Sequence, residues 1–153
     1  MARDMTWALI TNGVRCSILR NMEGGFSEPA IEIESKAKST HLRDIESDKP
    51  GRSFASGNTG HRSAMELGSD PIFRSMQDFA RDILHRLERH LRAGDLTRLA
   101  IFASPKMLGV LRNEMPDSLS NILIFEKDIN LINLSEADTS EAVLKEIGKR
   151  PLA

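Results

Sequence analysis

Leu99-Ala-Ile-Phe-Ala103 is an unbroken run of apolar residues, and Ser104-Pro105 follows it directly. A continuous apolar run of this length is typical of a strand that is buried on both faces of a sheet. Ser104 and Pro105 suit the start of a helix, and Pro116 ends the apolar pattern that follows them. Ile122-Leu-Ile-Phe125 is a second apolar run. Residues 99–125 therefore predict a strand, a helix and a second strand that is parallel to the first.

Residues 5–34 have a different pattern, in which apolar and polar residues alternate. Met5-Thr-Trp-Ala-Leu-Ile10 predicts a first strand, residues 14–20 predict a second and residues 30–34 a third. Asn12-Gly13 separates the first two strands, and an Asn-Gly pair in that place is a strong signal for a tight hairpin. Cys16 falls on the apolar face of the second strand, where we expect it to fill space in the core. The pattern predicts a three-stranded antiparallel meander.

Residues 70–94 predict a long amphipathic helix between these two blocks. Asp70 can cap the first turn, Pro71 suits the first position, and Gly94 fits the left-handed residue beyond the end. Apolar residues recur every three or four positions along one face. The other face carries basic residues, namely Arg74, Arg81, His85, Arg86, Arg89, His90 and Arg92. We interpret this face as solvated, with phosphate binding as the alternative.

A last helix is predicted from Ser135, where Asp138 completes a start that resembles a capping box. We predict one α/β domain over residues 1–153, with a long loop at 35–69. Its five-stranded mixed sheet consists of an antiparallel three-stranded meander followed by parallel β-α-β units. With helices on the faces of the sheet, this is the layout of a ribonuclease H-like domain.

The composition is that of an ordinary globular domain: 40% of the 153 residues are hydrophobic and 28% are charged, which excludes a disordered chain. Lys and Arg number 21 against 22 Asp and Glu, so contact with nucleic acid would need a local basic patch. A single cysteine excludes an internal disulfide. No apolar segment approaches the roughly 20 residues that cross a bilayer, and no export signal is visible. We therefore expect a cytoplasmic protein.

Residues for metal or cofactor chemistry are not grouped in the sequence. The first strand carries no carboxylate of the kind that binds two metals in nucleases of this layout. The four histidines have no metal-ligand spacing, and Gly57-Asn-Thr-Gly60 lacks the Lys-Ser/Thr ending of a phosphate loop. No nucleophile elbow of the form Gly-x-Ser-x-Gly is present. We expect no cofactor, no metal and no catalytic residue.

Residues 35–69 break both patterns. They are rich in Ser, Gly, Lys, Arg, Asp and His, and they show almost no apolar periodicity. A loop of this length inside a domain is uncommon and is either functional or disordered. Two interpretations stay open at this point: a solvated insertion and a binding loop.

Three stretches of the chain carry a family resemblance. They are Trp7-Ala-Leu-Ile-Thr-Asn-Gly-Val-Arg-Cys-Ser-Ile-Leu19, then Asp48-Lys-Pro-Gly-Arg-Ser-Phe-Ala-Ser56, and then residues 99–112 followed by Glu126-Lys-Asp128. In this order and spacing they resemble the bacterial host-attachment protein family, named as required for attachment to host cells. The resemblance covers nearly the whole chain. The chain departs from the family at Ser104, where a second proline is frequent, and at Ile129-Asn130, where Leu-Thr is usual.

That family is similar in turn to the middle domain of archaeal and eukaryotic peptide-chain release factors. In those proteins, the long loop before the main helix presents a Gly-Gly-Gln tip, followed by Ser-Ala, to peptidyl-tRNA. Aligned on Ser63-Ala64, the tip here is Gly60-His61-Arg62. The glutamine that helps to place water at the ester is missing, so the resemblance implies binding without peptide release.

The resemblance and the basic character of the loop together define a set of candidate residues for binding phosphates. They are Lys49, Arg52, Gly60, His61, Arg62 and Ser63 in the loop, with Arg81 on the helix that follows it.

Three functional hypotheses follow. We expect a non-catalytic intracellular adaptor that affects host attachment indirectly, through a protein partner of unknown identity. The alternative is a ribosome- or tRNA-associated factor, related to release or rescue factors, that lacks the Gly-Gly-Gln tip. The third hypothesis is a hydrolase that uses His61 or Ser63. All three are compatible with a homo-oligomer, and none needs insertion into a membrane.

Overall fold

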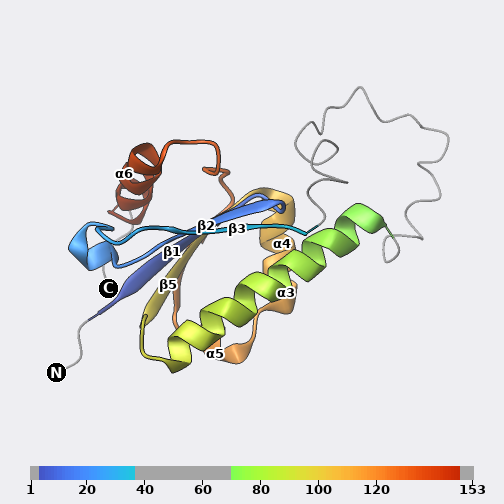
Figure 1. Ribbon diagram of the computed structural model, residues 1–153, viewed down its shortest axis with the longest axis horizontal. Coiled ribbons are helices and arrows are strands. Elements are labelled where there is room, and N and C mark those ends of the chain that lie inside the picture. Colours follow the sequence, from blue (N-terminus) through green and yellow to red (C-terminus); the bar gives the residue numbers. More distant parts are fainter. Residues whose placement is uncertain (1–3, 37–69, 149–153) are drawn as a thin grey trace.

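Five strands of the described residues form one mixed sheet, in the order β3-β2-β1-β5-β6 (Figure 1). The computed structural model describes residues 4–36 and 70–148, and its strands are β1 (Thr6–Thr11), β2 (Arg15–Leu19), β3 (Ile31–Glu34), β5 (Arg98–Ala103) and β6 (Leu123–Lys127). β1 pairs antiparallel with β2 and parallel with β5. The β2–β3 pair is antiparallel and the β5–β6 pair is parallel. The α/β class and the mixed five-stranded sheet are confirmed, whereas the ribonuclease H-like assignment stays a prediction.

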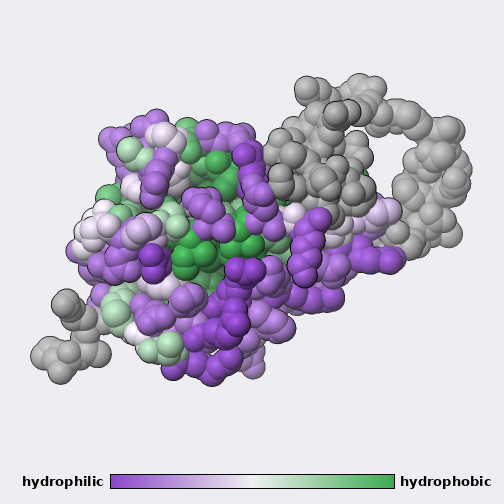
Figure 2. Space-filling view, viewed as in Figure 1, coloured by the Kyte–Doolittle hydropathy of each residue, from purple (hydrophilic) through white to green (hydrophobic). Residues whose placement is uncertain are grey.

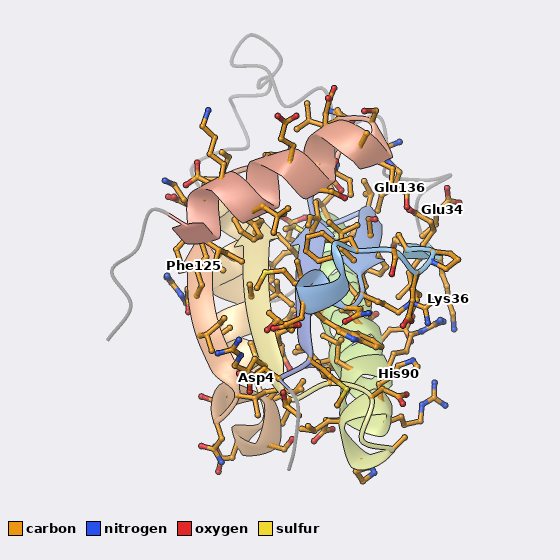
Figure 3. The ribbon with its side chains drawn as sticks, turned by 90° about the vertical axis from the view of Figure 1, so that its left-hand side faces the viewer. Asp4, Glu34, Lys36, His90, Phe125 and Glu136 are labelled. Carbon is orange, nitrogen blue, oxygen red and sulfur yellow. The ribbon has the colours of Figure 1, made fainter. Side chains whose placement is uncertain are left out.

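Helices cover both faces of this sheet (Figures 1 and 3). α3 (Pro71–Arg92), α4 (Pro105–Glu114) and α5 (Asp117–Ser120) lie on one face, α6 (Glu136–Gly148) lies on the other, and the 3-10 helix η1 (Met22–Gly24) connects β2 to β3. Successive residues of a strand point to opposite faces, and so the central strands supply two cores. Leu9 and Ile101 belong to the core under α3, and Ile10 and Phe102 belong to the core under α6.

α3 has the ends that the sequence predicts. The Ile72 backbone N–H donates to Asp70 Oδ1 at 3.0 Å, Pro71 opens the helix, and Gly94 beyond its end has a φ of +82°. One face of the helix is buried, through Met76, Phe79, Ala80, Ile83, Leu84 and Leu87. Burial of this face against the sheet stabilises the helix more than intrinsic propensity does.

The β1–β2 hairpin differs from the predicted two-residue Asn12-Gly13 turn. Thr11 pairs with Cys16, and the Asn12 N–H donates to the Arg15 carbonyl at 3.2 Å, so Gly13 and Val14 are the central residues of the turn. Asn12 Oδ1 accepts from the N–H groups of Val14 and Arg15 at 3.0 and 2.9 Å, which fixes the turn from inside. Gly13 has a φ of +102°, a backbone conformation that residues with a Cβ rarely adopt.

The shifted turn leaves the faces of β2 as predicted, because the register moves by an even number of residues. Cys16 is fully buried in the core under α3, as expected for a residue that fills space there. Burial raises the pKa of its thiol well above the ordinary value, with smaller contributions from nearby charges, so this cysteine is kept in its neutral form.

Three further features could not be foreseen from the sequence. β6 is an edge strand, and its apolar residues are therefore half-buried although they form a continuous run. In α6, Leu144 is 44% exposed, whereas Thr139 is buried and satisfies its hydroxyl by donating to the Ser135 carbonyl at 2.8 Å. The short helices η1 and α5 were not expected, since three or four residues carry no readable periodicity.

Candidate nucleic-acid interface

The outer side of α3 carries a line of exposed basic side chains. Residues 74, 78, 81, 85, 89 and 92 are all exposed, and they follow one another at intervals of three or four. Positions with this spacing lie above one another along a helix, so they form one line of roughly 27 Å at 1.5 Å per residue. Figure 2 shows hydrophilic residues along the length of α3. We call the basic members of this line the α3 stripe: Arg74, Arg81, His85, Arg89 and Arg92.

Arg81, the helix residue in the predicted binding set, is held by two carboxylates. Its Nε donates to Glu114 Oε1 of α4 at 2.9 Å, and its Nη1 lies 3.6 Å from Asp78 Oδ1. The hydrogen bond to Glu114 raises the pKa of the guanidinium. A guanidinium that already has two carboxylate partners has less of its charge to offer to a phosphate. Arg81 therefore contributes less to an anion site than its place in the line indicates.

Arg89 and Arg92 are the members of the α3 stripe with the most available charge. Both side chains are exposed, and neither has an ion-pair partner within residues 4–36 and 70–148. They stand in the last turn of α3, where the partial negative charge of the helix end favours cations. Both belong to the basic face predicted from the sequence but not to the predicted binding set, although their spacing from Arg81 was the signal that could have found them.

Arg86 and His90 do not belong to the α3 stripe, which corrects the prediction that seven basic residues share one face. Both are half-buried, because at 100° per residue they fall on the flank of the helix. Arg86 Nε lies 3.2 Å from Asp82 Oδ1, the pair that the spacing predicts. His90 Nδ1 lies 2.8 Å from Asp95 Oδ2. Arg86 and His90 therefore already have partners within the protein, at the side of the helix.

The six loop residues of the predicted set lie outside the described residues: Lys49, Arg52, Gly60, His61, Arg62 and Ser63. The structure does place the two chain segments that border this loop. β3 runs in the same direction as β1, because each pairs antiparallel with β2. The chain therefore leaves β3 at the end of the sheet where the parallel strands finish, and it returns at Asp70, one turn before Arg74. The candidate loop and the α3 stripe are thus continuous in the chain.

The comparison with known families gives the context for this surface. The sequence matches a family described as Bacterial archaeo-eukaryotic release factor family 12 over residues 5–143, a span that contains all five described strands. The chain belongs to this family. No curated protein matches the sequence significantly. The family 12 description refers to release factors and says nothing of host attachment, so the attachment role that the resemblance implies stays a prediction.

The family 12 domain shows two further features within its described residues. No three His, Cys, Asp or Glu side chains there come together in a way that could hold a metal ion. None of the described helices has the length and apolar character needed to cross a membrane.

Proposed function

We propose that this family 12 domain is a ribosome- or tRNA-associated factor that binds RNA phosphates through the α3 stripe and the basic residues of the preceding loop. The observation that carries the proposal is the pair Arg89 and Arg92, exposed and without carboxylate partners among the described residues, in line with Arg74. Family membership supports the ribosome as the setting. The guanidinium groups of these arginines match the oxygens of the RNA phosphates and do not contact base edges in this proposal. The binding is therefore independent of the RNA sequence.

The proposed role is binding and not peptide release. The tip that corresponds to Gly-Gly-Gln is Gly60-His61-Arg62, which offers two basic side chains and no glutamine. Such a tip would add phosphate contacts to those of the α3 stripe. The adaptor role in host attachment is a prediction that the described features leave untested.

Binding of unmodified tRNA tests the proposal directly. In the double variant Arg89→Gln/Arg92→Gln, we expect weaker binding and a shallower dependence of log K on log salt concentration. The slope should fall by about two, since each lost phosphate contact removes close to one unit. The matched control is Lys106→Gln/Lys145→Gln, which removes the same net charge from exposed positions on α4 and α6. It should leave the salt slope unchanged.

The loop is tested separately with Arg52→Ala/Arg62→Ala. A loss of affinity comparable to that of the α3 variant would support a continuous interface. If both double variants bind tRNA as the parent does, or if the control loses as much affinity as the α3 variant, the proposed interface is wrong.

A further inference from the structure

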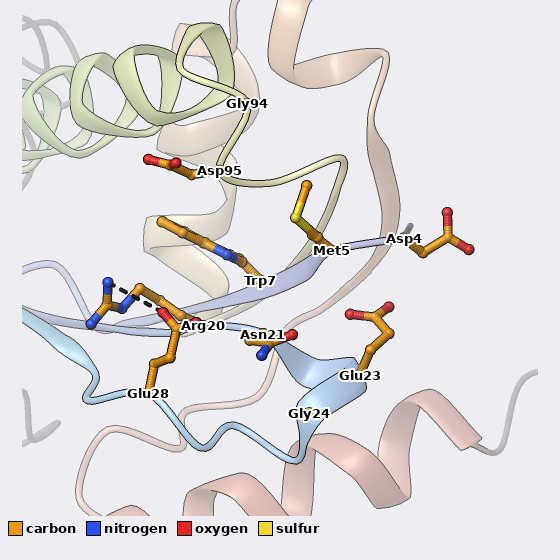
Figure 4. A pocket seen from close by; sticks show the side chains of 10 residues that line it. All are labelled: Asp4, Met5, Trp7, Arg20, Asn21, Glu23, Gly24, Glu28, Gly94 and Asp95. Carbon is orange, nitrogen blue, oxygen red and sulfur yellow. Dashed lines mark ion pairs between the residues drawn. The ribbon is translucent and has the colours of Figure 1, made fainter. Parts of the chain in front are cut away.

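A pocket lies where the end of α3 meets the start of β1. Its walls come from three separate segments: the beginning of β1, residues 20–28, and the turn after α3 (Figure 4). Its volume is about 660 Å³, which is within the range of pockets that hold small ligands or a few residues of peptide. Figure 3 views the molecule from this end, with Asp4 and His90 labelled. We call it the terminal pocket.

Trp7 lies across the middle of the terminal pocket, between Asp95 and Arg20 (Figure 4). The residue is 4% exposed, and its ring centroid is 4.9 Å from that of His90. No described residue accepts a hydrogen bond from the indole N–H, although an indole in a protein interior usually has an acceptor. This donor is therefore available to a ligand that carries a carbonyl or hydroxyl oxygen.

The charge of the lining determines which ligands fit. Four carboxylates line the terminal pocket, those of Asp4, Glu23, Glu28 and Asp95, against the single guanidinium of Arg20. Arg98 neutralises part of this charge from outside the lining, at 3.5 Å from Asp4 and 3.1 Å from Glu23. Glu28 pairs with Arg20 at 3.5 Å, and Asp95 Oδ2 lies 2.8 Å from His90 Nδ1. Both carboxylates are nevertheless about half exposed, and the guanidiniums of Arg20 and Arg98 compensate only two of the four negative charges of the lining. The balance repels phosphate and attracts a cation.

We propose that the terminal pocket binds a lysine or arginine side chain of a basic peptide segment. The cationic head lies beside the half-exposed carboxylates of Asp95 and Glu28. A backbone carbonyl of the same peptide accepts the unused indole N–H. Arg92 of the α3 stripe, although close in the chain, does not line the pocket and so leaves it acidic.

The site contains its own probe, because Trp7 is the single tryptophan of the chain and tyrosine is absent. Titration with acetyl-Gly-Arg-Gly-amide, monitored by tryptophan fluorescence, should give a saturable change. The analogue in which citrulline replaces arginine has nearly the same shape without the charge, and it should bind about tenfold more weakly. Equal affinity for the two peptides, or no saturable change with either, would overturn the proposal.

Two variants locate the binding in the terminal pocket. Asp95→Asn and Glu28→Gln should each weaken binding of the arginine peptide by about three- to tenfold. Asp95 and Glu28 lie on different segments, so if one variant fails to fold, the other still tests the proposal. Glu141→Gln is the matched control, since it removes one exposed carboxylate from α6 that does not line the pocket. An equal loss in the control would assign the effect to net charge and would refute a specific pocket.

Discussion

At the scale of single residues, Glu23 connects the start of β1 to the start of β5. Its two carboxylate oxygens accept from the Thr6 N–H at 2.8 Å and from the Thr6 hydroxyl at 2.6 Å, and Arg98 Nη2 donates to it at 3.1 Å. Burial alone raises the pKa of this carboxyl, but the hydrogen bonds from Thr6, together with that from Arg98, outweigh it and lower the pKa.

The lowered pKa makes part of the folding stability depend on pH. Because the folded-state pKa of Glu23 lies below its ordinary value of 4.5, its contribution is complete above that value and is lost as the pH falls through the folded-state pKa. We expect the free energy of unfolding of the parent to fall more steeply in this acid range than that of Glu23→Gln. Urea unfolding at a series of pH values measures this difference. Parallel curves for the two proteins would show that Glu23 has no such role.

The sequence predicted residue roles that depend on local pattern and missed those that depend on distant partners. Cys16 could be placed in the core because the alternation around it is a local signal. Glu23 could not be placed, since its partners are 17 and 75 residues away. The same holds for Arg81, whose partner Glu114 lies 33 positions away on another helix.

At the scale of elements, α3 was the most predictable part of the chain. Its cap, its first-turn proline and its apolar periodicity all indicate the same helix. The hairpin turn was less predictable, because both Asn12-Gly13 and Gly13-Val14 offer a glycine, and the Asn12 side-chain hydrogen bonds decide between them. The edge position of β6 could not be predicted, because an apolar run does not show which strand is last in the sheet.

Truncation of the buried face of α3 tests its place in the core. Ile83 is fully buried, and Ile83→Ala should lower the free energy of unfolding by about 2–5 kcal/mol, since it leaves a cavity. Arg89→Ala, on the exposed side of the same helix, should change it by about 0.5 kcal/mol or less. Denaturant unfolding gives both values. Similar costs for the two variants would mean that α3 does not pack on the sheet as described.

Across the whole molecule, α3 connects a predicted basic loop at its first turn to an acidic pocket at its last turn. Its first turn adjoins the predicted binding loop, and its last turn adjoins the acidic terminal pocket. The antiparallel meander and the parallel β-α-β units are readable in the sequence, which is why it could predict a mixed five-stranded sheet but not the order of its strands. The terminal pocket could not be predicted, because three distant segments form it. The loop residues from Lys49 to Ser63 remain predictions.

Sedimentation with ribosomes measures whether the protein binds them through the α3 stripe. The parent protein and the two double variants, Arg89→Gln/Arg92→Gln and Lys106→Gln/Lys145→Gln, are each centrifuged with purified ribosomes at low and at high salt. If the α3 stripe binds ribosomal RNA, the parent and the lysine control sediment with ribosomes at low salt and are released at high salt, because phosphate contacts are screened. The α3 variant should sediment less than the parent at low salt, because it has lost two phosphate contacts. Absence of the parent from the ribosome pellet at low salt would contradict binding through the α3 stripe, as would equal sedimentation of the α3 variant and the parent.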